Sequence, residues 1–190
     1  MGVGLIVFLG YQWSYLWAPL RTWGRCIEER RGACWRNYWR DPLSRSEYWR
    51  LYRYGRALWR AERDLRWGRN PERARRALLN LLYAQRRYAQ RRRWDLLPSP
   101  RWERHRSEYY ALRRYRREVE RLERALRWGR AFSPQEAKRA LRGAIEAEIR
   151  LLKARMRDIR RGNRYYWRDE EYRRLERCVR RLEREARRLR

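Results

Sequence analysis

An internal repeat is the feature that most constrains what this chain can fold into. Residues 46–69 and 107–130 align without a gap at an offset of 61 residues, and both copies end in the tetrapeptide Arg-Trp-Gly-Arg. The similarity continues from Pro71 and Pro134, now at an offset of 63 residues, and a third copy starts at Glu171. Repeats of this length are typical of helical hairpins that pack side by side. The sequence therefore predicts two hairpins and a final half repeat, at residues 42–94, 100–161 and 169–190.

Prolines and glycines mark the ends of the predicted helices. Four prolines follow an Asp, Asn or Ser, the residues that best cap a helix whose first position is proline: Pro42, Pro71, Pro100 and Pro134. Ser133 and Glu136 also have the spacing of a capping box. Glycines stand where a left-handed residue commonly ends a helix, at Gly68, Gly129 and Gly162. These signals predict helices over 42–67, 71–94, 100–128, 134–161 and 169–190, with Trp67, Gly68, Trp128 and Gly129 as structural turns.

Apolar side chains recur along these segments with helical spacing. Leu51, Tyr54, Leu58, Ala61 and Leu65 follow one another at steps of three and four residues, and the second copy repeats the stripe with Tyr115 at its centre. Such stripes place these side chains between helices, and no segment has the alternation of a β-strand. The predicted fold is all-α, with long antiparallel helices that form a repeated hairpin bundle or a short solenoid.

The N-terminal segment is the longest uncharged stretch. Residues 1–20 contain no charged side chain, their aliphatic residues come first, and their Trp and Tyr residues lie toward the charged part of the chain. A helix of this length is about 30 Å long, enough to cross a hydrocarbon layer. The pattern predicts a transmembrane helix over 1–20, followed by a basic juxtamembrane linker over 21–41 whose arginines contact anionic headgroups such as those of cardiolipin: Arg21, Arg25, Arg30 and Arg31. A helix buried within a soluble bundle is the alternative.

Charge points to an anionic partner. The chain has 53 Lys and Arg residues against 23 Asp and Glu, a net charge of +30. A chain this basic repels itself unless a polyanion or a large assembly neutralises it. The densest basic stretch with an aromatic neighbour supplies candidate partner contacts, namely Arg86, Arg87, Arg91, Arg92, Arg93 and Trp94. Charge alone does not distinguish RNA from anionic lipid or an acidic protein, and a solvated helix face gives the same pattern.

Catalytic and metal-binding signatures do not emerge from the sequence. Three cysteines, Cys26, Cys34 and Cys178, imply neither a disulfide framework nor the spacing of a zinc site, so we expect buried or idle thiols. His105 is the one histidine, and no nucleophile stands at a characteristic distance from it. We therefore expect a protein without enzymatic activity, cofactor or metal.

The tripeptide Leu51-Tyr52-Arg53 resembles the signature of the LYR family. The resemblance implies a basic three-helix bundle over 42–128, an aromatic residue on the second helix in the position of Tyr83, and membership of a mitochondrial respiratory or assembly complex. The second copy of the repeat departs from the signature, because it contains Leu112-Arg113-Arg114.

These observations predict a non-catalytic accessory subunit of a large inner-membrane complex. The mitochondrial respiratory chain or ATP synthase is the expected host, with the bulk of the chain on the matrix side, bracing partner subunits and contacting anionic lipid. The alternative is an organellar ribosomal protein whose arginine-rich helices bind rRNA.

Overall fold

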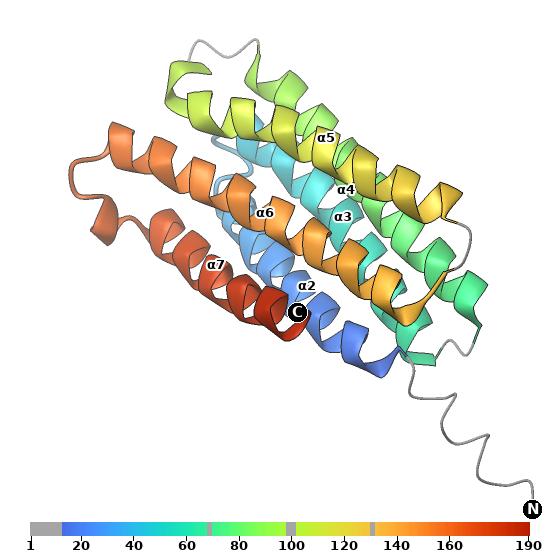
Figure 1. The fold of residues 1–190 in the computed structure, drawn as a ribbon. Helices are drawn as coiled ribbons and strands as arrows, with labels where there is room; N and C mark the ends of the chain where they lie inside the picture. The colour runs from blue at the N-terminus through green and yellow to red at the C-terminus, as the bar shows by residue number, and fades with distance from the viewer. Residues whose placement is uncertain (1–12, 68–69, 98–101, 130–131) are drawn as a thin grey trace, which may run out of the picture.

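The computed structural model describes residues 13–67, 70–97, 102–129 and 132–190, and these residues form an all-α fold, as predicted (Figure 1). The α-helices are α2 (Ser14–Arg36), α3 (Pro42–Trp67), α4 (Pro71–Leu96), α5 (Arg106–Trp128), α6 (Pro134–Gly162) and α7 (Glu170–Arg188). Two short 3-10 helices, η1 (Trp102–His105) and η2 (Tyr166–Arg168), precede α5 and α7.

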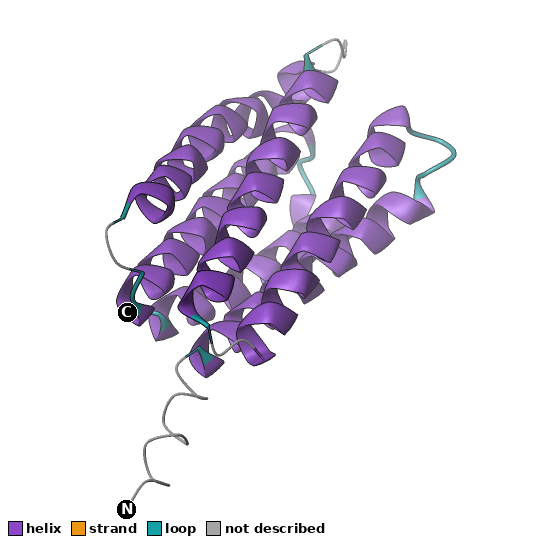
Figure 2. Cartoon of the chain, turned by 90° about the vertical axis from the view of Figure 1, so that its right-hand side faces the viewer, coloured by secondary structure: helices purple, strands orange, loops and turns teal. Residues whose placement is uncertain are grey.

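The six helices run up and down and close into a single bundle. Each helix packs against the next one in the chain, and α7 packs against α2, which closes the circuit. The connections α2–α3, α4–α5 and α6–α7 lie at one end of the bundle, while the start of α2 and the end of α7 lie at the other (Figures 1 and 2). The predicted hairpin bundle is thus confirmed, and the closure distinguishes it from an open solenoid.

Helix α2 changes the interpretation of the N-terminal segment. It is one helix across the predicted boundary at residue 20, with Pro19 inside it, and its inward side chains Leu16, Leu20 and Trp23 are at most 1% exposed within the bundle. The inward face of residues 13–20 therefore belongs to the bundle core, where neighbouring helices, chiefly α3, take the place expected for lipid. Among the helices that the structure describes, none has both the length and the apolar character needed to cross a bilayer. The rest of the predicted membrane helix, residues 1–12, lies outside the described residues.

Most predicted helix starts are confirmed. Asn70 and Ser133 accept hydrogen bonds from the amides of Glu72 and Glu136, and Ser133 forms the predicted capping box. The Asp41 carboxylate accepts the amides at the start of α3. The start expected at Pro100 lies outside the described residues, and α5 proper begins at Arg106.

The predicted left-handed glycines are not found where the structure describes them. Gly129 has φ −62° and ψ 133°, and Gly162 lies in the last turn of α6 without a positive φ. Arg75 explains the first case, since its guanidinium donates to the carbonyls of Leu126, Arg127 and Gly129 and so satisfies the end of α5 from a neighbouring helix. Trp128 is 77% exposed and does not anchor this turn. Trp67 ends α3, and Gly68 lies outside the described residues.

The repeat has a different phase from the predicted one. Helix α2 is the first half of a repeat, so the unit is a hairpin of α2–α3, α4–α5 or α6–α7. Positions on α2, α4 and α6 correspond at offsets of 62 and 63 residues, and positions on α3, α5 and α7 at 61 and 63. The buried side chains follow this register, as in Leu16, Leu78 and Leu141, or Leu51, Leu112 and Leu175, or Leu58, Val119 and Leu182. The chain is therefore three hairpins arranged around one core, and the predicted half repeat is completed by α2.

Gly55 allows α2 and α3 to approach closely in the first hairpin. An added Cβ would meet Oε1 of Glu28 at 2.9 Å and Ile27 Cγ2 at 3.5 Å. The Glu28 side chain is 48% exposed, so its carboxylate has room to move. Because glycine disfavours the middle of a helix, we expect Gly55→Ala to raise the free energy of unfolding by about 0.5–1 kcal/mol, measured by denaturant titration.

The control for this substitution is Gly24→Ala on α2, where nothing lies within 4 Å of the added Cβ. Both variants should gain similar stability. A gain at Gly24 together with a loss at Gly55 would show that the contact between α2 and α3 does not tolerate even a methyl group.

Candidate functional site

A buried network of arginines and glutamates lies in the core of the bundle. It is near the hairpin-turn end, the end where the α2–α3, α4–α5 and α6–α7 connections lie. Arg30, Arg92 and Arg155 occupy the same repeat position on α2, α4 and α6, and each pairs with a glutamate of the next helix. The pairs are Arg30–Glu47 at 3.2 Å, Arg92–Glu108 at 3.0 Å, and Arg155–Glu171. The repeat thus places one arginine and one glutamate from each hairpin in equivalent positions.

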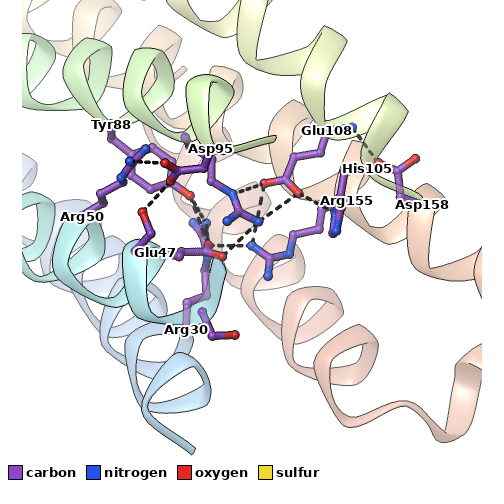
Figure 3. A network of polar contacts seen from close by, with 12 residues as sticks. Arg30, Glu47, Arg50, Tyr88, Asp95, His105, Glu108, Arg155 and Asp158 are labelled. Carbon is purple, nitrogen blue, oxygen red and sulfur yellow. Dashed lines mark hydrogen bonds and ion pairs between the residues drawn. The ribbon is translucent and has the colours of Figure 1, made fainter. Parts of the chain in front are cut away.

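Contacts between hairpins join these pairs into one network. Glu47 also forms an ion pair with Arg92 at 3.2 Å and accepts from Arg155 at 2.6 Å, so that three arginines meet one carboxylate. Figure 3 shows Arg30 and Arg155 converging on Glu47, with Glu108 above them. Tyr88 donates to Glu47 and accepts from Arg30. Since these contacts link all three hairpins, the network fixes how the hairpins fit together.

Another buried carboxylate, that of Glu148, contacts the tyrosines that recur in the repeat. Tyr54 and Tyr115, at the same repeat position, lie with their hydroxyl oxygens 3.3 Å apart, and Tyr115 donates to Glu148 at 2.6 Å. Glu148 also accepts from Arg30 at 2.7 Å. The sequence prediction that Tyr115 belongs to the core is confirmed, because the residue is 1% exposed.

The arginines keep the buried carboxylates ionised. Burial alone would raise the pKa of Glu47, but Arg155, Arg92 and Arg30 together lower that pKa to about 2. Burial likewise opposes ionisation of Glu108, and Arg92 and Arg155 hold its pKa well below the usual range. Each buried arginine therefore faces carboxylates within the bundle, and the network has a structural role.

The positive charge that remains lies on the surface between hairpins. A groove between α5 and α6, with a volume of about 1150 Å³, is lined by six cations and two carboxylates: Arg106, Arg114, Arg150, Lys153, Arg157, Arg161, Glu103 and Glu118. The equivalent groove between α3 and α4 is lined by Arg50, Arg53, Arg87 and Arg91 around Tyr54, Tyr83, Ala84 and Tyr88, without a carboxylate. A third hollow lies between α7 and α2 and is lined by four arginines and two glutamates: Arg36, Arg174, Arg177, Arg181, Glu29 and Glu170. Arg36 pairs with Glu170 and Arg181 with Glu29, so Arg177 is the exposed arginine of this hollow without a carboxylate at ion-pair distance among the described residues. We call these three the inter-hairpin grooves.

The repeat places equivalent arginines on the surface of each hairpin, and all of them except Arg25 line one of these grooves. Arg53, Arg114 and Arg177 share one position on α3, α5 and α7, and Arg25, Arg87 and Arg150 share another on α2, α4 and α6; all six are exposed. Within the described residues, Arg150 pairs with Glu118 at 2.7 Å and the other five have no carboxylate at ion-pair distance. Arg87 donates to the Tyr83 hydroxyl. Exposed arginines with few acidic neighbours are suited to bind phosphate groups.

The arginines predicted on α4 are divided between core and surface. Arg87 and Arg91 line the α3–α4 groove. Arg86 turns toward Glu123 of α5 at 3.2 Å, and Arg93 lies over the Tyr109 ring. Arg92 is 2% exposed within the network, so it does not face a partner and this part of the prediction is corrected. Trp94, at the hairpin-turn end, is 64% exposed.

The arginines predicted to contact headgroups are divided in the same way. Arg21 and Arg25 are exposed on α2. Arg30 is 4% exposed and bound to Glu47 and Glu148, which corrects its predicted surface role. Arg31 pairs with Glu28 and lies over the rings of Tyr48 and Tyr52. Arg30 and Arg92 are buried because they occupy the same inward-facing position of the repeat. The local sequence around either residue does not show this.

The thiols and the histidine have structural surroundings. Cys26, Cys34 and Cys178 are free and buried, as expected, and burial raises the pKa of Cys34 to about 12. His105 is half-buried, with Nδ1 3.5 Å from Glu108, so it lies closer to the network than its sequence position suggested.

No family model matches the chain, and neither the curated proteins nor the solved structures yield a match. The LYR-like tripeptide lies on α3 of a six-helix circuit, with Leu51 in the core and Tyr83 44% exposed on α4. The functional interpretation therefore depends on the network and the grooves themselves.

Proposed function

We propose that this protein is a non-catalytic RNA-binding bundle whose inter-hairpin grooves hold the phosphates of folded RNA. The observation that carries the proposal is the recurrence of exposed arginines at equivalent positions in all three hairpins, beside grooves whose cations outnumber their carboxylates. Arginine forks fit phosphate oxygens, and release of counterions from RNA supplies much of the binding free energy. The host expected for such a protein is a ribonucleoprotein such as an organellar ribosome.

The distribution of the grooves favours RNA over a flat lipid surface. The α3–α4, α5–α6 and α7–α2 grooves lie at successive positions around the closed circuit of helices. A planar bilayer reaches only one side of such a bundle, whereas folded RNA is able to surround it. Basic surface on several sides is therefore better matched to RNA.

The membrane-complex accessory subunit is the second proposal, with the mitochondrial inner membrane, cardiolipin and acidic partner subunits as its context. The uncharged residues 1–12 and the exposed Arg21 and Arg25 support it. Carbonate extraction of membranes and RNase treatment of the native assembly separate the two proposals. Release by carbonate together with disruption by RNase supports RNA, and retention in the membrane pellet with resistance to RNase supports the membrane subunit.

The groove arginines give a direct test of RNA binding. We expect the combined substitution of Arg53, Arg87, Arg114 and Arg150 by Gln to weaken binding to a structured RNA by about tenfold or more at moderate salt. The slope of log affinity against log salt should fall by roughly one for each phosphate contact that is lost. Filter binding or fluorescence anisotropy at several salt concentrations measures both quantities.

The control has the same net charge but leaves the grooves intact. Exposed arginines that line none of the three grooves are replaced by Gln instead, namely Arg60, Arg121, Arg139 and Arg184. This variant should lose clearly less affinity than the groove variant. Equal losses would mean that net charge alone attracts the RNA, and the grooves would then have no special role.

A further inference from the structure

Exposed aromatic side chains gather at the end of the bundle where the three hairpin turns lie. Near the α2–α3 turn lie the exposed Trp35, Trp39 and Trp49 and the half-buried Tyr38, near the α4–α5 turn lie Trp94 and Tyr110, and near the α6–α7 turn lie Tyr165 and Trp167. The three turns lie at the same end in Figures 1 and 2. We call these eight residues the turn-end aromatic set.

The rings are held in place while much of their surface stays in solvent. Trp39 is 77% exposed and Trp167 is 51% exposed. Tyr38 and Trp39 meet at an interplanar angle of 79°, and Tyr165 and Trp167 at 78°, so neighbouring rings do not cover one another by stacking. Trp49 donates to the Tyr38 hydroxyl at 3.0 Å. The exposed rings therefore present flat faces to solvent in fixed orientations.

Arginines lie among these rings. Arg45 is placed over Tyr38 and Trp39, at 5.5 and 5.9 Å from the ring centroids, and Arg168 over Tyr165 at 5.8 Å. The combination of a flat ring and a guanidinium recurs at the first and third turns. It offers a stacking surface beside a phosphate-binding group.

The second turn joins the aromatic set to an inter-hairpin groove. Tyr110, which is 49% exposed, lines the α5–α6 groove together with Arg106 and Arg161, which lie near the same end of the bundle. A strand whose phosphates bind the arginines of this groove is therefore within reach of an exposed ring that lines the same groove.

From this arrangement we infer that the turn-end aromatic set stacks on unpaired nucleotides, so that the protein binds RNA where a duplex opens into a single-stranded segment. The inference rests on the proposed function. Rings of paired bases are hidden inside a duplex, whereas unpaired bases stack on aromatic and guanidinium planes.

The test replaces one ring at each turn with leucine in the full chain, as Trp39→Leu, Trp94→Leu and Trp167→Leu together. Leucine keeps an apolar side chain but removes the flat ring. Affinities for an unstructured RNA strand and for an RNA duplex of equal length are measured at the same salt concentration. We expect the single strand to lose roughly tenfold or more, in line with the stacking of one or more bases, and the duplex to lose less than about twofold.

A matched control uses two exposed tryptophans outside the set, Trp59→Leu and Trp128→Leu, which are 59% and 77% exposed. This control should leave both affinities unchanged. Equal loss for strand and duplex in the triple variant, or no loss for either, overturns the inference.

Two further results separate this inference from its premise. If the unaltered protein binds neither RNA, the proposed function itself fails. If the unaltered protein sediments with anionic vesicles, and the triple variant loses that binding but keeps its affinity for the single strand, then the aromatic set is a membrane-docking surface and the inference is overturned.

Discussion

Replacing Arg92 by leucine is expected to lower the free energy of unfolding by about 3–5 kcal/mol, the usual range when one member of a buried ion pair is removed. Arg92 is 2% exposed and pairs with Glu47 at 3.2 Å and Glu108 at 3.0 Å. Leucine would leave both carboxylates in the core with fewer cations. For a chain of this size the midpoint of thermal unfolding should fall by roughly 10 °C. Thermal unfolding followed by circular dichroism, with denaturant titration, measures the change.

The neighbouring Arg91 supplies a control with the same chemistry. Arg91 is half-buried, lines the α3–α4 groove and has no carboxylate at ion-pair distance among the described residues. Arg91→Leu should change the free energy of unfolding by less than about 0.5 kcal/mol. Similar losses for the two variants would contradict the structural role assigned to the network.

A double substitution separates the ion pair from simple loss of packing. In Arg92→Leu/Glu108→Leu the cation and one of its carboxylates are removed together. Since the uncompensated charge is then reduced, the double variant should be less destabilised than the sum of the two single variants predicts. A strictly additive result would mean that Arg92 and Glu108 do not act as a pair.

Helices with two independent sequence signals were predicted well. The bounds of α3 agree with the prediction, because Asp41 and Pro42 define its start and the stripe from Leu51 to Leu65 defines its buried face. The capping box at Ser133 likewise fixed the start of α6. Helix ends were less predictable, since the end of α5 is satisfied by Arg75 from a neighbouring helix rather than by a local glycine motif.

Residues 13–20 were assigned to a membrane helix because absence of charge has two physical meanings. A lipid layer and a protein core both exclude charged side chains, and α2 buries Leu16, Leu20 and Trp23 in the second of these. The register of the repeat distinguishes a core helix from a membrane helix in this case. Leu16, Leu78 and Leu141 match at offsets of 62 and 63 residues, which makes α2 the partner of α4 and α6.

The arginine-rich composition prevented prediction of which arginines are buried. Nearly every cation in this chain is arginine, so no short pattern separates Arg92 from its surface neighbours Arg91 and Arg93. The repeat does so, because Arg30, Arg92 and Arg155 recur in register opposite Glu47, Glu108 and Glu171. In a chain with such biased composition, the spacing between distant copies is more informative than the local motif.

Acidification is expected to destabilise the bundle between about pH 5 and pH 2. Arg155, Arg92 and Arg30 overcome the effect of burial and lower the pKa of Glu47 to about 2, below its value of 4.5 in a model peptide. A carboxyl whose pKa is lowered on folding contributes stability above its unfolded pKa, and this contribution is lost as the pH falls toward the folded pKa. For Glu47 it amounts to about 3 kcal/mol. Glu108 acts in the same direction, since its pKa is also held well below the usual range.

Glu47→Gln tests this assignment, because the amide keeps the shape of the side chain and removes its titration. The variant should be less stable than the unaltered protein at pH 7, and the difference in unfolding free energy should shrink as the pH is lowered toward 2. Glu176→Gln is the control, since Glu176 lies on the surface of α7 and pairs only with Arg180 among the described residues. A pH dependence that is the same in Glu47→Gln and in the unaltered protein would place the acid-sensitive groups elsewhere. A flatter dependence in Glu47→Gln alone would show that Glu47, which contacts an arginine of each hairpin, is a principal acid-sensitive group of the bundle.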